Sequence, residues 1–212
     1  MRKLITEQDV IKAVNKGSSV IAVEENAIFT PLALDLIRSK KLQIISKEVH
    51  DYSSSSSTVK FPFKKISIGS DHTGFKTKNL LIKLLAEKGY QVYDLGTFDE
   101  KSCDFPDFAE AVAEKVQLGK SDCGIILDAT GIPSAITANK LEGIRAATCY
   151  NEFSAKSSRS HNDANILVLG AKTLGDETIK SIVDVWLNTG FEGGRHQRRL
   201  DKITGIERKY KS

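Results

Sequence analysis

Apolar and polar positions alternate regularly from Lys65 onward. Short apolar runs, typical of strands, are each followed by a longer stretch with helical spacing. The runs cover residues 66–69, 91–95, 124–127, 144–149 and 166–169, and the helical stretches cover 75–88, 105–118, 133–140, 152–160 and 177–187. Strands that are apolar on both faces and separated by helices indicate a parallel sheet with right-handed crossovers. The pattern therefore predicts a Rossmann-like three-layer α/β/α domain with a five-stranded parallel sheet.

The first part of the chain carries a shorter pattern of the same kind. Thr6 suits the cap of a first helix and Gly17 its end. Helices are predicted over 6–16 and 31–39, and strands over 19–23 and 42–45. The serine-rich stretch that follows has almost nothing to bury, which is typical of a linker. We therefore expect a small N-terminal α/β extension over 1–48, a linker over 49–63, and the main domain over 64–212.

The composition is typical of a soluble globular protein, with 40 % hydrophobic and 27 % charged residues. No apolar run could cross a bilayer, and the first residues lack the basic-then-apolar order of a signal peptide. We therefore expect a cytoplasmic protein that does not bind membranes. The cysteines Cys103, Cys123 and Cys149 are odd in number and lack metal-like spacing, which argues against a disulfide framework. Cys123 and Cys149 lie in apolar stretches and are expected to be buried.

Positive charge is concentrated near the C-terminus. The net charge is only +4, and much of it comes from the basic residues between positions 195 and 211. Aromatic side chains are not interleaved with these cations, as a stacking surface for bases would require, so no nucleic-acid partner is expected. A small phosphate ester is the more economical anionic partner.

Two loops at predicted carboxyl ends of strands carry acidic residues, and ligands bind beyond these ends in such sheets. Asp71 and His72 follow the first strand and precede a helix start whose N–H groups can bind phosphate. Asp128 follows the third strand, before a turn at Thr130 and Gly131 whose N–H groups can stabilise an enediolate oxyanion. Helix capping is the alternative role for both aspartates, and a carboxylate bound to helix N–H groups would be a weaker base.

Two further motifs supply an imidazole and a pair of guanidinium groups. His161, followed by Asn162, precedes the fifth strand, and an imidazole suits acid–base chemistry near neutral pH. Arg195 and Arg199 are four residues apart, so on a helix they share a face and could grip one phosphate. A solvated basic helix end is the alternative. The histidines are scattered without ligand spacing, so neither a metal nor another cofactor is expected.

Taken in order, these motifs resemble those of the type B ribose-5-phosphate isomerase and galactose-6-phosphate isomerase family, from about Lys65 to Glu207. The matching blocks are residues 69–75, 104–107, 130–132, 138–140, 143–147, 161–165 and 192–199. The resemblance implies an aldose–ketose isomerase of a sugar phosphate, with ribose 5-phosphate to ribulose 5-phosphate as the leading reaction. It further implies a metal-free route through a cis-enediolate, in a site shared between the two subunits of a homodimer. A tetramer is the alternative assembly.

The resemblance also implies a role for each candidate residue. Asp71 and His72 would contact the sugar and its phosphate, and the turn at Thr130 and Gly131 would stabilise the enediolate. His161 would open the furanose ring with Asn162 beside it, both reaching across from the other subunit. The remaining positions expected to bind substrate or its phosphate are Phe105, Ser134, Lys172, Arg195 and Arg199. Lys172 keeps the charge of a family arginine but lacks its bidentate fork.

Several positions near the reacting carbons depart from the family pattern. Most members have a cysteine base where this chain has Asp128, and Ser134 occupies the position of the glutamate that a second branch uses. Pro133 removes one N–H donor from the turn, and Phe105 lacks the hydroxyl of a tyrosine. A carboxylate is suited to enolisation, so we hypothesise that Asp128 shuttles the proton between C1 and C2.

Two alternatives to this function remain. The first is an isomerase of another pentose or hexose phosphate. The second is a catalytically silent sugar-phosphate-binding or scaffold protein. A solvent-reachable Asp128 carboxylate directed into the crevice would support catalysis, whereas a carboxylate bound to helix N–H groups would support the silent protein.

The N-terminal extension has a resemblance of its own. Residues 23–37 are similar to a short module that precedes some enzymes of bacterial microcompartments, including certain cobalamin adenosyltransferases. This similarity implies docking on a microcompartment or on another protein, with the serine-rich linker as tether. The alternative is an ordinary extension that stabilises the oligomer.

Overall fold

The computed structural model describes residues 4–15, 20–23, 28–40, 42–46 and 63–210. The chain divides into two compact units, residues 1–58 and 59–212, and each is described by itself. All of the predicted linker except Phe63 lies outside the described residues. Phe63 stacks on Trp186 with ring centroids 5.6 Å apart, so it belongs to the packing of the second unit.

The second unit is built on a five-stranded parallel sheet, which confirms the predicted fold class. The strands are β5 (Lys65–Ser70), β6 (Gln91–Asp94), β7 (Cys123–Asp128), β8 (Ala146–Thr148) and β9 (Ile166–Gly170), in the order β6-β5-β7-β9-β8. The chain passes from β5 to β6 on one side and later adds β7 on the other side of β5. The carboxyl ends of β5 and β7 therefore form a topological switch point, where such sheets bind ligands.

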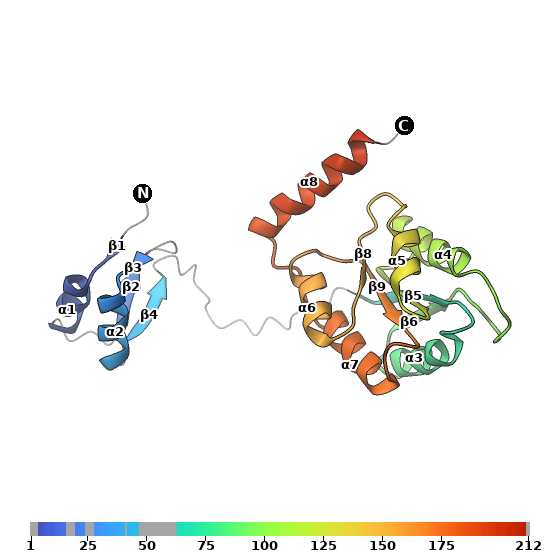
Figure 1. The fold of residues 1–212 in the computed structure, drawn as a ribbon, viewed down its shortest axis with the longest axis horizontal. Helices are drawn as coiled ribbons and strands as arrows, with labels where there is room; N and C mark the ends of the chain where they lie inside the picture. Colours follow the sequence, from blue (N-terminus) through green and yellow to red (C-terminus); the bar gives the residue numbers. More distant parts are fainter. Residues whose placement is uncertain (1–3, 16–19, 24–27, 41, 47–62, 211–212) are drawn as a thin grey trace. The chain divides into compact units, whose positions relative to one another are not determined.

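Helices cover both faces of this sheet (Figure 1). The first face is covered by α3 (Phe75–Glu87), α6 (Glu152–Ser160) and α7 (Asp176–Leu187), and the second by α4 (Phe105–Gln117) and α5 (Ile132–Ala138). Each face of the sheet has its own hydrophobic core, and successive residues of β7 point into them alternately. Ile125 and Leu127 pack in the core under α3, α6 and α7, and Ile126 packs in the core under α4 and α5. Burial of each such side chain contributes about 1.5–3 kcal/mol, which explains why the β7 sequence is apolar on both faces.

The last helix, α8 (Arg195–Lys209), extends away from these layers (Figure 1). Its buried residues are His196 and Leu200. Near its far end, the Glu207 carboxylate accepts a hydrogen bond from the Gly143 N–H at 3.3 Å. Arg195 and Arg199 therefore share a helix, as the spacing predicts, and both side chains are exposed.

The first unit contains two pairs of short parallel strands and two helices. Its elements are β1 (Leu4–Ile5), α1 (Glu7–Asn15), β2 (Val20–Val23), β3 (Ile28–Phe29), α2 (Pro31–Ser39) and β4 (Gln43–Ser46), with β1 beside β3 and β2 beside β4. The sequence did not predict β1 and β3, which are only two residues long. Thr6 precedes α1 and exchanges hydrogen bonds with Asp9, whereas Gly17 lies outside the described residues.

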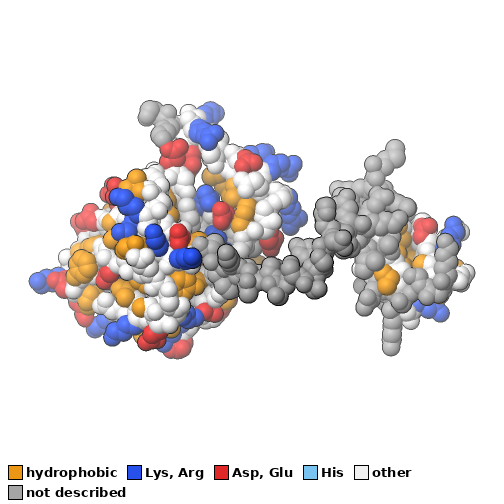
Figure 2. Space-filling model, turned by 180° about the vertical axis from the view of Figure 1, so that it is seen from behind, with side chains coloured by type: hydrophobic (Ala, Val, Ile, Leu, Met, Phe, Trp, Pro, Cys, Tyr) orange, Lys and Arg blue, Asp and Glu red, His pale blue; other side chains and the backbone are white. Residues whose placement is uncertain are grey.

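Positive and negative side chains are interspersed over the face shown in Figure 2. Within the described parts of the chain, no helix is long and apolar enough to cross a membrane.

Candidate active site

Asp71 lies directly after β5 and is buried, with 7 % of its surface exposed. Its Oδ1 accepts hydrogen bonds from the Thr73 and Gly74 N–H groups at 2.8 and 3.2 Å, and from the Thr73 hydroxyl. Asp71 therefore binds the turn that precedes α3, whose N-cap is Gly74, rather than the N–H groups of the helix itself. The Asp71 N–H donates to the Leu127 carbonyl at 3.1 Å, which joins this loop to the end of β7.

His72 is half-buried and is held by a residue that the sequence analysis did not select. The Cys103 N–H donates to Nδ1 of His72 at 3.3 Å, and the Cys103 Sγ lies 4.0 Å from the same nitrogen. Because an N–H can only donate, the neutral imidazole carries its proton on Nε2. His72 therefore has a donor free for a substrate oxygen.

Asp128 ends β7 and is 1 % exposed. Its Oδ1 accepts from the N–H groups of Thr130 at 2.7 Å and Gly131 at 2.5 Å, and its Oδ2 accepts from the Ser134 N–H at 3.1 Å. Both carboxylate oxygens are therefore engaged by the loop, so Asp128 occupies the N–H donors expected for an enediolate. This arrangement is the one expected of a carboxylate that caps a helix, since Ser134 lies in the first turn of α5.

The turn after Asp128 is closely packed. Gly131 has a φ of 81°, and an added Cβ would lie 2.8 Å from Cγ2 of Thr148, so only glycine fits without strain. The Ser134 hydroxyl is fully buried and has no hydrogen-bond partner among the described residues. Lys172 joins the loop from the other side, since its N–H donates to the Ala129 carbonyl at 3.0 Å while its side chain remains exposed.

A second cluster lies where α6 ends and α8 begins. The rings of His161 and His196 stack with centroids 4.3 Å apart, and Nε2 of each lies within 3.8 Å of a Glu192 carboxylate oxygen. Nε of Arg195 and Nη1 of Arg199 lie 3.4 and 3.5 Å from the two ring nitrogens of His196. Burial, followed by the positive charges of His161 and both arginines, lowers the pKa of His196, and Glu192 opposes this effect.

His161, Glu192 and His196 are also the one group in the described residues whose ligand atoms could share a metal ion. However, two guanidinium groups border the imidazole of His196, and their charge opposes a cation at this position. The same charges attract a phosphate. The chemistry of the cluster therefore fits an anion better than a metal.

Asn162 and its neighbours shape the loop that presents His161. The Asn162 side chain is exposed, and the next residue, Asp163, has a φ of 43°. The Asp163 carboxylate forms ion pairs with Arg145 at 3.0 Å and with Arg159 at 2.9 Å. These two arginines fix the loop from either side, and neither was predicted as a site residue.

The structure thus gathers the predicted residues into two groups. Asp71, His72, Asp128 and the 130–134 turn lie around the switch point, whereas His161, Asn162, Arg195 and Arg199 lie at the α6–α8 cluster. Within the described residues, no hydrogen bond or ion pair joins the two groups. Phe105 begins α4 and is half-buried.

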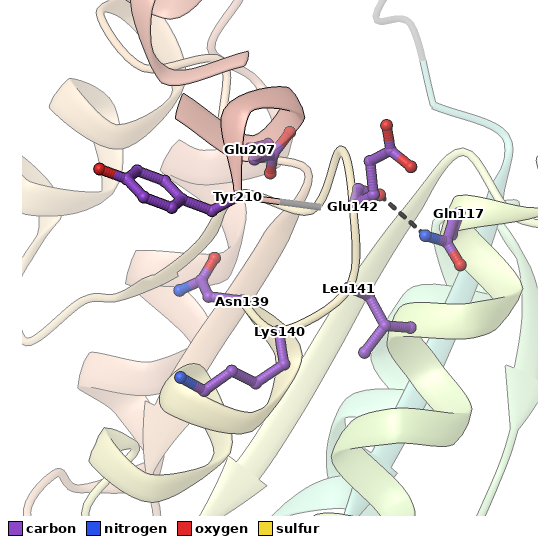
Figure 3. A pocket seen from close by; sticks show the side chains of 7 residues that line it. All are labelled: Gln117, Asn139, Lys140, Leu141, Glu142, Glu207 and Tyr210. Carbon is purple, nitrogen blue, oxygen red and sulfur yellow. Dashed lines mark hydrogen bonds between the residues drawn. The ribbon is translucent and has the colours of Figure 1, made fainter. Parts of the chain in front are cut away.

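A hollow lies elsewhere in the second unit. It has a volume of about 450 Å³ and is lined by residues of the α4 end, the loop after α5, and the α8 end (Figure 3). Lys140 and Tyr210 extend along it, and the Gln117 side chain donates to the Glu142 carbonyl. None of the predicted site residues lines this hollow, so its size does not make it the reaction site.

Comparisons with known proteins agree on one family. Residues 66–203 match the model of a family described as ribose/galactose isomerase. Ribose-5-phosphate isomerase B of Escherichia coli is 45 % identical over 146 residues, which span 69 % of this chain and 98 % of that protein. The structure of the Clostridium thermocellum ribose-5-phosphate isomerase B superposes with a TM-score of 0.69 at 49 % identity, covering 69 % of this chain and 99 % of that one. The Mycoplasma genitalium enzyme, solved with bound ribulose 5-phosphate, gives a TM-score of 0.66 at 41 % identity, covering 68 % and 96 %.

Proposed function

The chain belongs to the ribose/galactose isomerase family, and from this membership we propose that it interconverts ribose 5-phosphate and ribulose 5-phosphate. The observation that carries the proposal is the 45 % identity to a ribose-5-phosphate isomerase B along nearly the whole of that enzyme. The bound ribulose 5-phosphate of the Mycoplasma genitalium relative supports the same sugar. The enzyme is then an aldose–ketose isomerase.

In the proposed reaction a base removes the proton from C2 of the open-chain aldose. The resulting cis-enediolate takes the proton back at C1, while a hydroxyl proton moves from O2 to O1. The Thr130 and Gly131 N–H groups, which donate to Asp128 in this structure, are the candidate donors to the negative oxygen. Asp128 is the candidate base. To act, its carboxylate must first break its hydrogen bonds with the Thr130, Gly131 and Ser134 N–H groups.

The α6–α8 cluster is the proposed phosphate site. Arg195 and Arg199 offer two exposed guanidinium groups beside His196, and His161 is the candidate acid for opening the furanose ring. We propose that the complete site lies between two copies of the chain, with His161 and Asn162 reaching the switch point of the other copy. Exposed apolar side chains on α5 (Ile132 and Ile136) and on α6 (Phe153) support a homodimer, with a tetramer as the alternative.

The state of Asp128 favours a second candidate function. A buried carboxylate with three N–H partners is what a silent sugar-phosphate binder would also contain. Both functions need the phosphate cluster, so binding alone does not separate them.

The deciding experiment is ribulose 5-phosphate formation from ribose 5-phosphate by the purified protein, beside Asp128→Asn and Asp128→Cys. Turnover that falls at least 100-fold in Asp128→Asn and partly returns in Asp128→Cys would support both the isomerase and its base. Full activity in the Asn variant would reject Asp128 as the base. Binding of ribose 5-phosphate without turnover would reject this reaction and leave another sugar phosphate, or the silent binder.

For the N-terminal unit we propose a docking role on a bacterial microcompartment or another protein. The side chains of Leu32 and Ile44 are 64 % and 45 % exposed on this small unit, which supports a contact with a partner. Removal of residues 1–58 should leave turnover unchanged and abolish co-purification with compartment shells. Loss of the native oligomer in the truncated protein would instead support a stabilising extension.

A further inference from the structure

The turn after Asp128 is held by side chains on both sides of its peptide planes. In the peptide between Thr130 and Gly131, the carbonyl accepts from the Tyr150 hydroxyl at 3.1 Å and the N–H donates to Asp128 at 2.5 Å. A trans peptide directs these two groups in opposite directions. Tyr150 and Asp128 therefore hold opposite ends of one peptide plane.

The next peptide plane is held in a similar way. The Gly131 carbonyl accepts from the Thr148 hydroxyl at 2.7 Å, and the Ile132 N–H donates to the Thr130 hydroxyl at 3.2 Å. Thr148 also packs its methyl group against Gly131. The turn therefore cannot rotate either peptide without breaking a hydrogen bond.

The backbone of Tyr150 is held beside the start of α6, while its side chain is 42 % exposed. Its N–H donates to the Ser154 hydroxyl at 3.2 Å, and Asn151 forms the capping box that begins α6. Thr148 is the last residue of β8 and pairs with Val168 of β9. Thr148 thus lies on a strand of the sheet and Tyr150 in the bend just before α6, about twenty residues away from the turn in sequence.

We propose that Tyr150 and Thr148 are positioning residues of the isomerase, which keep the two peptide planes oriented when Asp128 leaves the turn. The inference rests on the proposed function. When a substrate oxygen replaces the Asp128 carboxylate, the Gly131 N–H loses the partner that fixes it. The hydroxyl of Tyr150 on the same peptide then keeps that N–H directed at the developing enediolate, at no cost of reorganisation.

The expected fall in kcat can be judged from what oxyanion donors contribute in other enzymes. Complete removal of one oxyanion donor lowers kcat by about 100- to 1,000-fold, and loss of its orientation should cost less. We expect Tyr150→Phe, which removes only the hydroxyl, to lower kcat about tenfold with KM unchanged. Tyr210→Phe is the matched control, because Tyr210 is 73 % exposed at the end of α8 and should leave kcat at the native value.

Thr148 offers a test by rescue. Thr148→Val removes the hydroxyl and should lower kcat by a similar factor, whereas Thr148→Ser retains the hydroxyl and should restore most of the activity. A structural role through packing alone would give the opposite order, since Val keeps the branched shape of Thr and Ser does not. Equal kcat for Thr148→Val and the native chain would therefore overturn the proposal for Thr148.

A measurement independent of turnover separates this proposal from the proposed function. Amide hydrogen exchange should show the Gly131 N–H to be protected in the native protein and to exchange at least tenfold faster in Tyr150→Phe, at unchanged Tm. If exchange is faster in Tyr150→Phe but the native protein does not turn over ribose 5-phosphate, the proposed reaction is rejected. The role of Tyr150 in orienting the turn is then still supported. Unchanged exchange and unchanged kcat in Tyr150→Phe would overturn the inference.

Discussion

Lys78 and Asp94 form an ion pair whose lysine side chain is completely buried, with Nζ 2.6 and 2.7 Å from the two carboxylate oxygens. The Asp94 side chain is 29 % exposed, and its Oδ1 also accepts from the Gly96 N–H. The pair joins α3 to the end of β6, beside the strand that carries Asp71. The two partners are therefore unequal, since only the lysine lacks access to water.

Breaking this pair from either side should have different effects on stability. Asp94→Asn leaves a buried ammonium without its counter-charge and should lower the free energy of unfolding by about 3–5 kcal/mol. Lys78→Met removes the buried charge and leaves a partly hydrated carboxylate, so we expect a smaller loss, about 1–2 kcal/mol. Urea denaturation of both variants measures the difference. Equal losses would show that the lysine is better solvated than its burial indicates.

Gly131 and Gly143 provide a matched pair for testing how tightly the turn is packed. Both have positive φ, 81° and 74°, but an added Cβ would contact Thr148 at 2.8 Å only at Gly131, whereas the space at Gly143 is open. Gly143→Ala should cost about 1–2 kcal/mol from backbone conformation alone. Gly131→Ala should cost about 1–3 kcal/mol more, because the methyl group overpacks the turn. Unfolding by urea checks both values, and a similar loss in the two variants would contradict the close packing.

His196 should make stability depend on pH. Because its pKa is lowered in the folded protein, the unfolded chain binds more protons between the lowered value and the ordinary one, about 6.5. The stabilising contribution of neutral His196 is therefore complete above pH 6.5 and is lost as the pH falls through the folded pKa. His196→Gln should reduce the drop in Tm between pH 7.5 and pH 5.5.

A control tests whether the charged neighbours of His196 set the pH at which it takes up a proton. His161, Arg195, Arg199 and Glu192 face the ring, so each of them affects its protonation. Arg199→Gln should shift the midpoint of the pH dependence upward, because it removes one positive charge. A Tm profile of His196→Gln that parallels the native one would show that other groups cause the dependence.

The cysteines should differ in their reaction with iodoacetamide. Burial raises the pKa of the Cys123 and Cys149 thiols, whereas Cys103 is half-exposed beside His72. Since the thiolate is the nucleophile, we expect one fast adduct, at Cys103, in the folded protein. Three adducts should form in urea. Mass spectrometry of the peptides identifies the modified residue, and fast labelling of Cys149 in the folded chain would contradict its burial.

The layered fold of the second unit could be predicted because its strands are apolar on both faces and its helices have a regular period. The strand predicted over 144–149 proved shorter, since Ile144 donates to Leu141 in the preceding turn rather than to β9. Strands β1 and β3 escaped prediction because two residues give no periodicity. Local patterns therefore predicted the order of the helices and strands more accurately than the residues at which they begin and end.

The environment of the candidate site was harder to predict. The sequence left Asp128 as either base or cap, because the direction of its carboxylate depends on how residues 129–134 fold back. The contacts of Cys103 with His72 and of Tyr150 with Thr130 join residues 31 and 20 positions apart, and no local signal indicates them. His196 was not predicted as a site residue, because the four-residue spacing of Arg195 and Arg199 pointed to the two arginines alone. Such long-range contacts become visible only once the sheet has brought the loops together.

The order of the strands has a consequence for protein engineering. The carboxyl ends of β5 and β7 form a switch point because β6 and β7 lie on opposite sides of β5, so its location is set by the strand order. A small library that varies positions 128, 130 and 134 together would sample different proton-transfer chemistries on one fixed scaffold.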